Sequence, residues 1–562
     1  MKIALIQPPI RDFYITQIRM TPLGLLYLAG VLKQRGHNVI LIDAISSQTR
    51  KTILIPKEIS YLKKYYIAGD KSPFRLFGSY YHFGMDYNQI RERIKEEKAD
   101  VYCISMLMTP YHKEAEKIAE IVKEEFPEAT TIVGGGHATL EPLSVLNNPS
   151  IDYVVLGEGE EILPALIKII EENDFPKLHS LKSIGFKQNG KIFVNEFSSI
   201  VNVDETPFPA REIMGENFYK ADDKRITPIL FSRGCPHRCI YCSVPIIFGN
   251  KYRIRNPKAV IDEIVECGRR FNIEIFDFED DNLTFQRETA IELFNGIKKY
   301  FPREGQIECR AMNGLTASSL DEELLIKMRS AHFKSLNLAL ITTDESLQNK
   351  WKRPFNSECF SNVVKMGFNI GFNITGYQIV GIPGQTLNEM IETFLFLKSL
   401  PIKIGVSIFY PIPQTPIFDV CVENKYIQKD DFISFRSSAI PVETDEFSRD
   451  DLFTFLVAAR IHNFLTEHPS IFGGQNNFNY SIKENTNPEK LISLYPLSFE
   501  DIGKIVLRLW REKRKVYAVC KAKKQIQEEE RGNFQIVKDN QISYQYDLIE
   551  LPVVKNLLDR LL

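Results

Sequence analysis

The chain has 562 residues, of which 44% are hydrophobic and 25% are charged, so its composition is that of a globular protein with the length of several domains. Its formal net charge of −2 excludes the strong basic bias of a nucleic-acid-binding surface. Apolar runs stay shorter than the roughly 18 residues that a transmembrane helix needs, so we expect no transmembrane segment.

Residues 1–180 alternate short apolar runs with helical patterns, which predicts a doubly wound α/β sheet. The segment Leu23–Leu32 is apolar nearly all round and predicts a buried helix. The stretch 45–86 interrupts the alternation, and its pattern assigns no element. The predicted buried strands are Ile3–Ile6, Val39–Ile42, Val101–Ser105, Thr131–Val133 and Tyr153–Leu156.

Two glycine-rich turns follow predicted strands, at Gly134-Gly135-Gly136 and at Gly157-Glu158-Gly159-Glu160. Taken alone, each turn indicates only a tight strand–helix connection. The first strand lacks the G-x-G-x-x-G spacing of a dinucleotide site, which disfavours NAD. A hairpin is predicted at Ser183–Val194, where apolar alternation surrounds an Asn-Gly pair, and residues 181–224 form this hairpin and a proline-containing linker.

From residue 225 to 425 strands and helices alternate again, beginning with Ile226–Phe231. This pattern predicts a (β/α) barrel, complete or partial, with function on the loops after the strands. One of these strands, Phe276–Phe278, runs into carboxylates, which suit either a helix N-cap or a binding site. Residues 430–562 form a mixed C-terminal domain, predicted to shape a substrate cavity. Its basic stretch 508–524 predicts a solvated helix, with a surface for an anionic substrate or a membrane as the alternative.

The loop after Ile226–Phe231 contains Cys235, Cys239 and Cys242 in a C-x3-C-x2-C spacing. Three thiolates are one fewer than a closed 4Fe–4S cluster takes, so one iron of such a cluster keeps an open position. The alternative is a zinc site with a remote fourth ligand, but zinc ribbons usually pair two C-x2-C units and the sequence has no second one. His237 lies inside the loop and is predicted to be a surface residue or a neighbour of the ligands. The other cysteines are scattered singly, and Cys103 falls in a predicted buried strand.

This cysteine spacing, with the aromatic Tyr241 before the last cysteine, resembles the signature of the radical SAM superfamily. The resemblance implies a 4Fe–4S cluster whose open iron binds S-adenosylmethionine (SAM) and cleaves it to a 5′-deoxyadenosyl radical. It departs where Thr342-Thr343 replaces a family Glu-Ser and where Gln385 replaces a glutamate. The SAM contacts that it implies are Tyr241 in the cysteine motif, and Asp280 and Asp281 at the ammonium group. They also include Arg310 at the carboxylate, Thr342 at the ribose and Gly381 beside adenine.

The segments 20–36, 133–142 and 151–161 resemble the cobalamin-binding domain that precedes the barrel in many radical SAM enzymes. The resemblance implies that the glycine turns contact the nucleotide tail of cobalamin. The Asp-x-His-x-x-Gly segment that supplies a cobalt ligand in some cobalamin proteins is absent, which implies cobalt without a protein histidine. A domain that keeps the fold but binds no cofactor stays open. The implied contacts are Gly134, Gly135, Gly136, Gly157 and Glu158.

The expected activity is cobalamin-dependent methylation of an unactivated carbon in a small-molecule or lipid-like substrate, with a low-potential electron donor such as flavodoxin or ferredoxin. The alternative is a non-methylating radical reaction, such as oxidative cyclisation, rearrangement or carbon–carbon coupling. A tRNA methylthiotransferase is disfavoured because it needs three further N-terminal cysteines where only Cys103 stands. A cobalamin sensor would leave the cysteine loop without a use. The unpatterned cysteines and an oxygen-sensitive cluster predict a cytoplasmic protein.

Overall fold

The N-terminal sheet has the strand order β10-β9-β8-β7-β6-β1-β3 in the computed structural model, which describes residues 1–15, 21–47, 49–198, 201–353, 356–469, 480–483, 489–493, 496–522 and 544–562. Strands β3, β1, β6, β7 and β8 run parallel, and the predicted hairpin extends them as β9 and β10. The order reverses direction between β1 and β6, where open α/β sheets bind ligands. The strands are β1 Lys2–Gln7, β3 Asn38–Asp43, β6 Val101–Ser105, β7 Thr130–Gly134, β8 Tyr153–Val155, β9 Ile184–Gln188 and β10 Lys191–Val194.

Helices cover both faces of this sheet, which confirms the predicted doubly wound architecture. One apolar core joins the sheet to α1 and α6, and a second core on the other face joins it to α2, α3 and α5. Helix α1 covers the predicted buried segment. The helices are α1 Leu23–Gln34, α2 Tyr87–Glu97, α3 His112–Glu125, α4 Gly136–Leu140, α5 Pro142–Leu146 and α6 Gly159–Glu172.

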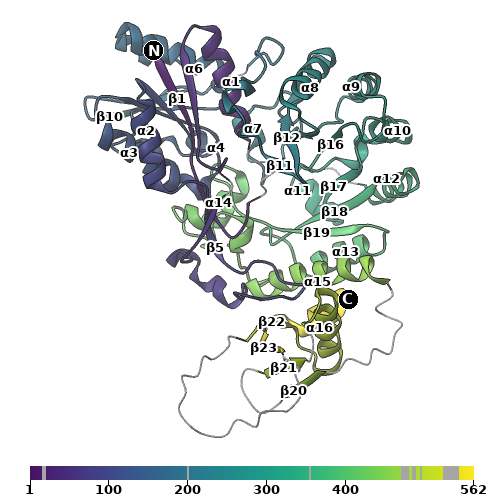
Figure 1. The fold of residues 1–562 in the computed structure, drawn as a ribbon. Coiled ribbons are helices and arrows are strands. Elements are labelled where there is room, and N and C mark those ends of the chain that lie inside the picture. The colour runs from purple at the N-terminus through teal and green to yellow at the C-terminus, as the bar shows by residue number, and fades with distance from the viewer. Residues whose placement is uncertain are drawn as a thin grey trace, which may run out of the picture.

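The second part of the chain is a partial barrel of parallel strands with helices on its outer side (Figure 1). Its strands pair as β12-β15-β16 and β17-β18-β19, and isolated parallel bridges join the two groups. The strands are β12 Lys224–Ile229, β15 Ile275–Phe278, β16 Glu308–Arg310, β17 Ser335–Ile341, β18 Asn373–Val380 and β19 Lys403–Ile408. The helices are α7 Val244–Ile247, α8 Pro257–Phe271, α9 Arg287–Tyr300, α10 Glu322–Ser330, α11 Glu345–Lys350, α12 Ser357–Ile370 and α13 Leu387–Lys398.

Short strands flank the entry to the barrel. Strand β11 (Lys220–Ala221) pairs antiparallel with β12, directly before it in the chain. Strands β13 (Ser232–Arg233) and β14 (Arg253–Ile254) pair with each other and enclose the cysteine loop and α7. The cysteine loop therefore begins and ends at a fixed pair of strands.

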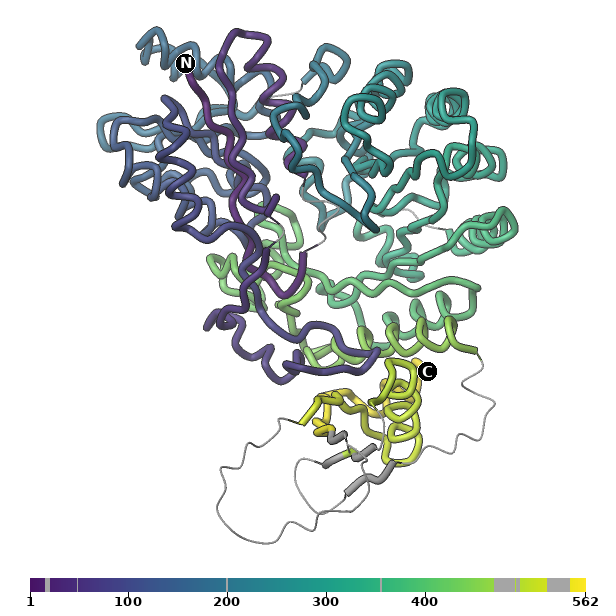
Figure 2. Tube along the Cα trace, in the orientation of Figure 1, coloured from purple at the N-terminus to yellow at the C-terminus, as the bar shows by residue number. Residues whose placement is uncertain are grey.

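The segment 45–86, which the sequence pattern left unassigned, docks on the C-terminal part of the chain (Figure 2). Its strands β4 (Arg50–Ile53) and β5 (Tyr80–Phe83) pair with β2 (Ile10–Asp12) in a small antiparallel sheet. The hydroxyls of Tyr61 and Tyr66 donate to the carbonyls of Ala439 and Ser438, at 2.6 Å each. A carboxylate oxygen of Asp70 accepts from the backbone N–H of Val519 at 2.9 Å.

A buried carboxylate completes this docking. Asp12 forms an ion pair with Arg436 at 3.1 Å and accepts hydrogen bonds from the hydroxyls of Tyr111 and Ser438 at 2.7 and 3.0 Å. Asp12 and Arg436 are 2% and 5% exposed, so this charge pair depends on both ends of the chain for its shielding from water. The N-terminal domain is therefore in direct contact with the C-terminal region.

The C-terminal region combines helices with an antiparallel sheet of order β20-β21-β23-β22. Its basic stretch is helical only to Lys513, as the end of α16, and Lys521 lies in β22, so the prediction of one helix through the stretch is wrong beyond Lys513. Residues 523–530 lie outside the described residues. Across the described ranges, each helix is too short or too polar to cross a bilayer. The elements are α14 Pro416–Glu423, α15 Arg449–Glu467, β20 Tyr480–Lys483, β21 Glu489–Ser493, α16 Phe499–Lys513, β22 Tyr517–Lys521, β23 Tyr544–Glu550 and α17 Lys555–Leu561.

Candidate functional site

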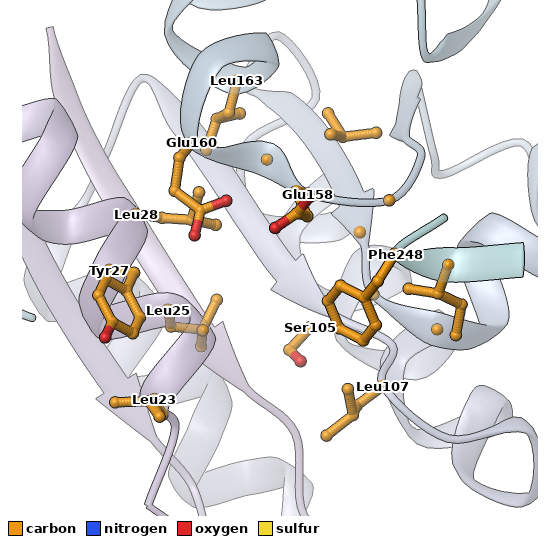
Figure 3. A pocket seen from close by; sticks show the side chains of 18 of the residues that line it. Leu23, Leu25, Tyr27, Leu28, Ser105, Leu107, Glu158, Glu160, Leu163 and Phe248 are labelled. Carbon is orange, nitrogen blue, oxygen red and sulfur yellow. The ribbon is translucent and has the colours of Figure 1, made fainter. Parts of the chain in front are cut away.

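A cavity of about 310 Å³ lies between the N-terminal sheet and the barrel. Its wall combines the start of α1, the end of β6, both glycine turns and residues on either side of the cysteine loop. Figure 3 shows Glu158 and Glu160 directed toward the space between Tyr27 and Leu25 of α1 and Phe248. The site residues predicted from the sequence that line it are Gly134, Gly135, Gly136, Gly157, Glu158 and Asp281.

The glycine turns allow neighbouring loops to approach closely. Gly135 has a φ of 116°, and a Cβ there would lie 2.8 Å from the carbonyl oxygen of Met106. A Cβ at Gly136 would lie 2.5 Å from the carbonyl oxygen of Leu107, and one at Gly157 would lie 2.5 Å from the ring of Phe197. Gly134 ends β7 and has ordinary room around it. Glycine at these turns is therefore required by the close approach of neighbouring protein atoms.

The cysteine loop runs from β13 to α7 and holds its three thiols in one neighbourhood. Burial raises the pKa of Cys242 to about 12, and the nearby thiols of Cys239 and Cys235 add to the increase. The backbone N–H of Cys242 donates to the carbonyl of Cys239 at 3.1 Å. Within the described parts of the chain, no three His, Cys, Asp or Glu side chains are arranged to share one metal ion. A 4Fe–4S cube places each cysteine on a different iron, so its ligands do not converge on a point.

The segment after α11 supports the cysteine loop, and sequence analysis did not foresee this contact. Trp351 is fully buried, and its carbonyl accepts from the N–H of Ile240 at 3.3 Å. The Cys239 thiol lies 3.9 Å from the carbonyl of Lys352. Tyr241 lies beside the Cys239 thiol and meets the Trp351 ring edge-on, with the ring centroids 6.3 Å apart. The aromatic residue of the motif therefore braces the loop from inside the barrel.

The two aspartates after β15 have different partners. Asp280 is 3% exposed and accepts hydrogen bonds from the N–H groups of Phe231 and Ser232 and from the Ser232 hydroxyl. Burial raises the pKa of Asp280 to about 7 and that of Asp281 to about 6. Asp281 lies beside the backbone of Gly234 and lines the cavity. Asp280 thus fastens the start of the cysteine loop to β15, and Asp281 is the aspartate of the two that lines the cavity.

Three further predicted SAM contacts lie outside the lining of this cavity within the described residues. Arg310 pairs with Glu308 and lies 3.8 Å from a carboxylate oxygen of Asp222. Thr342 is 1% exposed, and its hydroxyl donates to the buried carboxylate of Glu389. Gly381 has a φ of 88° and packs against α15. Their assignment to SAM stays a prediction.

Glu389 ties together the loops after β17 and β18. Besides Thr342, it accepts from the amide of Gln385 at 3.0 Å and from the hydroxyl of Thr393 at 3.1 Å. The Gln385 side chain in turn accepts from the N–H of Ile382 at 2.9 Å, so it closes its own loop. Glu389 lies eight residues past Gly381 on α13, and no local sequence pattern signals this role.

Charged side chains also link the N-terminal domain to the barrel beside the cavity. Arg233 lies 2.8 Å from a carboxylate oxygen of Glu158 and 2.6 Å from one of Glu160. Arg253 lies 2.7 Å from the other oxygen of Glu158. The carboxylate of Glu158 is therefore occupied by two guanidinium groups, so a cobalamin contact there would fall to the backbone of its turn. Arg233, Arg253 and Glu160 were missed because nothing in the sequence pairs residues 73 or more positions apart.

Comparison with known families identifies both halves of the site. The model for the B12 binding domain matches residues 79–167, and that for the radical SAM superfamily matches residues 229–397. The chain therefore contains a B12 binding domain followed by a radical SAM domain. The radical SAM domain implies a 4Fe–4S cluster and SAM, and the B12 binding domain implies cobalamin. The three neighbouring thiols fit a cluster, and the glycine turns that line the cavity fit a cofactor that contacts backbone.

Individual relatives are distant in sequence. An uncharacterized methyltransferase of Pyrococcus horikoshii is 23% identical over 83% of this chain and 93% of its own. An anaerobic magnesium-protoporphyrin IX monomethyl ester cyclase of Rubrivivax gelatinosus is 24% identical over 71% of this chain and 65% of its own. The solved structure of the radical SAM methyltransferase TsrM from Kitasatospora setae, with cobalamin and a 4Fe–4S cluster bound, has a TM-score of 0.57 at 16% identity. It covers 76% of both chains, which shows a shared fold.

Proposed function

We propose that the protein is a cobalamin-dependent methyltransferase that acts on an unactivated carbon of a small-molecule or lipid-like substrate. The supporting observation is that one cavity is lined both by the glycine turns of the B12 binding domain and by residues beside the cysteine loop. Methylation of an unactivated carbon needs a radical source and a methyl carrier within reach of the same substrate atom. A shared cavity supplies that proximity.

The chain's own residues divide the work of binding. Cys235, Cys239 and Cys242 would hold the cluster, which when bound would supply the electron for SAM cleavage, and bound cobalamin would supply a methyl carrier. Asp281 faces the cavity and offers a carboxylate to the SAM ammonium group. The backbone of the glycine turns at Gly135 and Gly157 receives the nucleotide tail. The electron comes from a low-potential donor such as flavodoxin or ferredoxin.

A second candidate keeps the same domains and cofactors but transfers no methyl group. The similarity to the protoporphyrin monomethyl ester cyclase supports it, because that relative is named for ring closure. Cyclisation, rearrangement or carbon–carbon coupling would use the radical alone. The two candidates differ in the fate of the SAM methyl group.

The test follows that methyl group without requiring the substrate. Anaerobically reconstituted protein with reduced cobalamin is incubated with SAM carrying a ¹³C-labelled methyl group. We expect labelled methylcobalamin on the protein, and 5′-deoxyadenosine when a strong reductant is added. Formation of 5′-deoxyadenosine without any labelled methylcobalamin would favour the second candidate and contradict the first.

Matched cysteine variants serve as the control. Cys239→Ala removes a cluster ligand, so it abolishes 5′-deoxyadenosine formation and lowers the iron content. Cys359→Ala removes a partly exposed cysteine on α12 outside the loop and leaves both unchanged. Unchanged 5′-deoxyadenosine formation in Cys239→Ala would contradict every radical mechanism for this protein.

A further inference from the structure

The buried charges between the two domains adjoin both cofactor motifs. Glu158 and Glu160 belong to the glycine turn after β8, on the N-terminal side of the cavity. Arg233 is followed directly by Gly234 and Cys235, and Arg253 faces it across the β13–β14 pair. A displacement of these charges would therefore move the cobalamin turn and the cluster loop relative to each other.

The group is largely buried and balanced in charge. The side chains of Glu158, Glu160, Arg233 and Arg253 are 1%, 8%, 9% and 12% exposed. Two carboxylates face two guanidinium groups, so no formal charge is left over. Burial by itself lowers the pKa of Arg233, but Glu160, Tyr27 and Glu158 outweigh it and raise that pKa above its ordinary value, so the guanidinium stays charged.

Such a group contributes more to geometry than to stability. The desolvation cost of burying two ions offsets much of the free energy of their attraction. A well-packed apolar contact of the same volume is often as stable. An apolar contact tolerates sliding, whereas a guanidinium that bonds two carboxylates in its own plane fixes direction as well as distance. Arg233 also packs over the face of the Tyr27 ring, with its guanidinium carbon 4.9 Å from the ring centroid.

The backbone between Arg233 and Cys235 transmits that position. Gly234 has a φ of 81°, and a Cβ there would lie 2.6 Å from the carbonyl oxygen of Lys251, so the strands are in close contact at this point. The backbone of Gly234 also lies beside the carboxylate of Asp281. Because Gly234 is enclosed between Lys251 and Asp281, the location of the Arg233 guanidinium sets that of the first cluster cysteine.

We propose that Arg233, held by Glu158 and Glu160, is a positioning residue that sets the separation between the iron–sulfur cluster and cobalamin. The proposal rests on the cofactor assignment and is independent of whether a methyl group is transferred. In this role the arginine acts through the cysteine loop and touches neither substrate nor the reacting atoms. Lysine cannot replace it, because one ammonium group cannot bridge both carboxylates in a fixed plane.

The test measures the separation directly. Pulsed dipolar EPR on protein loaded with a reduced 4Fe–4S cluster and cob(II)alamin gives the distribution of distances between the two centres. We expect one narrow distribution in the unaltered protein and a broader, shifted one in Arg233→Lys and in Glu160→Gln, at unchanged iron and corrin content. No substrate or turnover is involved, so failure of the methyl-transfer assay does not affect the result.

A matched control comes from a second buried charge group in the same molecule. Glu263 lies 2.7 Å from Arg211 and 2.7 Å from Arg255, with all three side chains at most 5% exposed, and it joins the linker to α8. Glu263→Gln removes a buried charge of the same kind that contacts neither cofactor loop itself and is linked to Arg233 only through Arg255 and Tyr27. We expect it to lower the melting temperature and to leave the distance distribution narrow.

A second measurement decides the matter if a variant does not take up both cofactors. Hydrogen exchange on the full-length, cofactor-free chain should show residues 157–160 and 232–235 exchanging about tenfold faster in Glu160→Gln, because local opening becomes easier there. Glu263→Gln should leave these amides unchanged. Equal distance distributions and equal exchange rates in all proteins would overturn the proposal. Faster exchange of the same amides in Glu263→Gln would also overturn it, because it would indicate a general effect on stability.

Discussion

The substitution Gly135→Ala tests whether the close approach of the loops after β6 and β7 requires glycine at this position. The φ of 116° and ψ of −174° at Gly135 lie where side-chain-bearing residues cost on the order of 1–3 kcal/mol. The new Cβ would also lie 2.8 Å from the Met106 carbonyl oxygen, 0.6 Å short of the 3.4 Å at which ordinary contact begins. Forcing the β6 and β7 loops apart adds about 1–3 kcal/mol. We expect a total loss of about 2–6 kcal/mol.

The assay compares the free energy of unfolding in urea with that of a control glycine. Gly190 in the β9–β10 hairpin has a φ of 71° and no heavy atom within 4 Å of its would-be Cβ, so Gly190→Ala carries only the left-handed penalty of about 1–2 kcal/mol. Gly135→Ala should also weaken cobalamin binding in a spectroscopic titration, whereas Gly190→Ala should not. Equal losses of stability and equal cobalamin affinities in the two variants would refute the argument from close approach.

Three further substitutions test buried carboxylates. Burial raises the pKa of Asp43 to about 6, so protonated Asp43 contributes about 3 kcal/mol of stability below about pH 4. This contribution is lost as the pH rises through 6. In Asp43→Asn, the free energy of unfolding in urea should not fall with pH in this range. Arg436→Met leaves Asp12 buried without its cation, so it should cost about 3–5 kcal/mol of unfolding free energy, and adding Asp12→Asn should restore most of it. Glu389→Gln should weaken SAM binding in calorimetry, because Glu389 holds Thr342, the predicted ribose contact. Glu392→Gln, at an exposed position on the same helix, should leave the affinity unchanged. Equal SAM affinities in the two variants would exclude a role of Glu389 in holding the SAM site.

Local pattern was sufficient for the elements that bury themselves against near neighbours. The strand runs at Ile3–Ile6 and Val101–Ser105 and the all-round apolar segment Leu23–Leu32 are visible because their hydrophobic residues face a core on every side. The hairpin at Ser183–Val194 is visible because its turn residues dictate their own conformation. The cysteine loop is visible because its chemistry needs a fixed spacing.

Elements that depend on distant partners were not predictable in this way. The segment 45–86 is stabilised by Ser438, Ala439 and Val519, so its own pattern contains only half of the interaction. The basic stretch after α16 changes from helix to strand because β22 pairs with β23, which follows later in the chain. The link from Arg233 to Glu158 spans 75 positions, and each residue by itself resembles an ordinary surface charge.

The docking of segment 45–86 on the C-terminal region also orders events during synthesis. Asp70 and Val519 are 449 residues apart, and at about 5–20 residues per second the ribosome needs roughly 20–90 s to supply the second after the first. The strands of the N-terminal sheet all lie within residues 2–194, so that sheet can form while Tyr61, Tyr66 and Asp70 still await their partners. The contacts of Asp12 with Arg436 and of Asp70 with Val519 therefore form after the N-terminal sheet. A nascent chain that stops before these partners leaves the segment 45–86 exposed to proteases and chaperones.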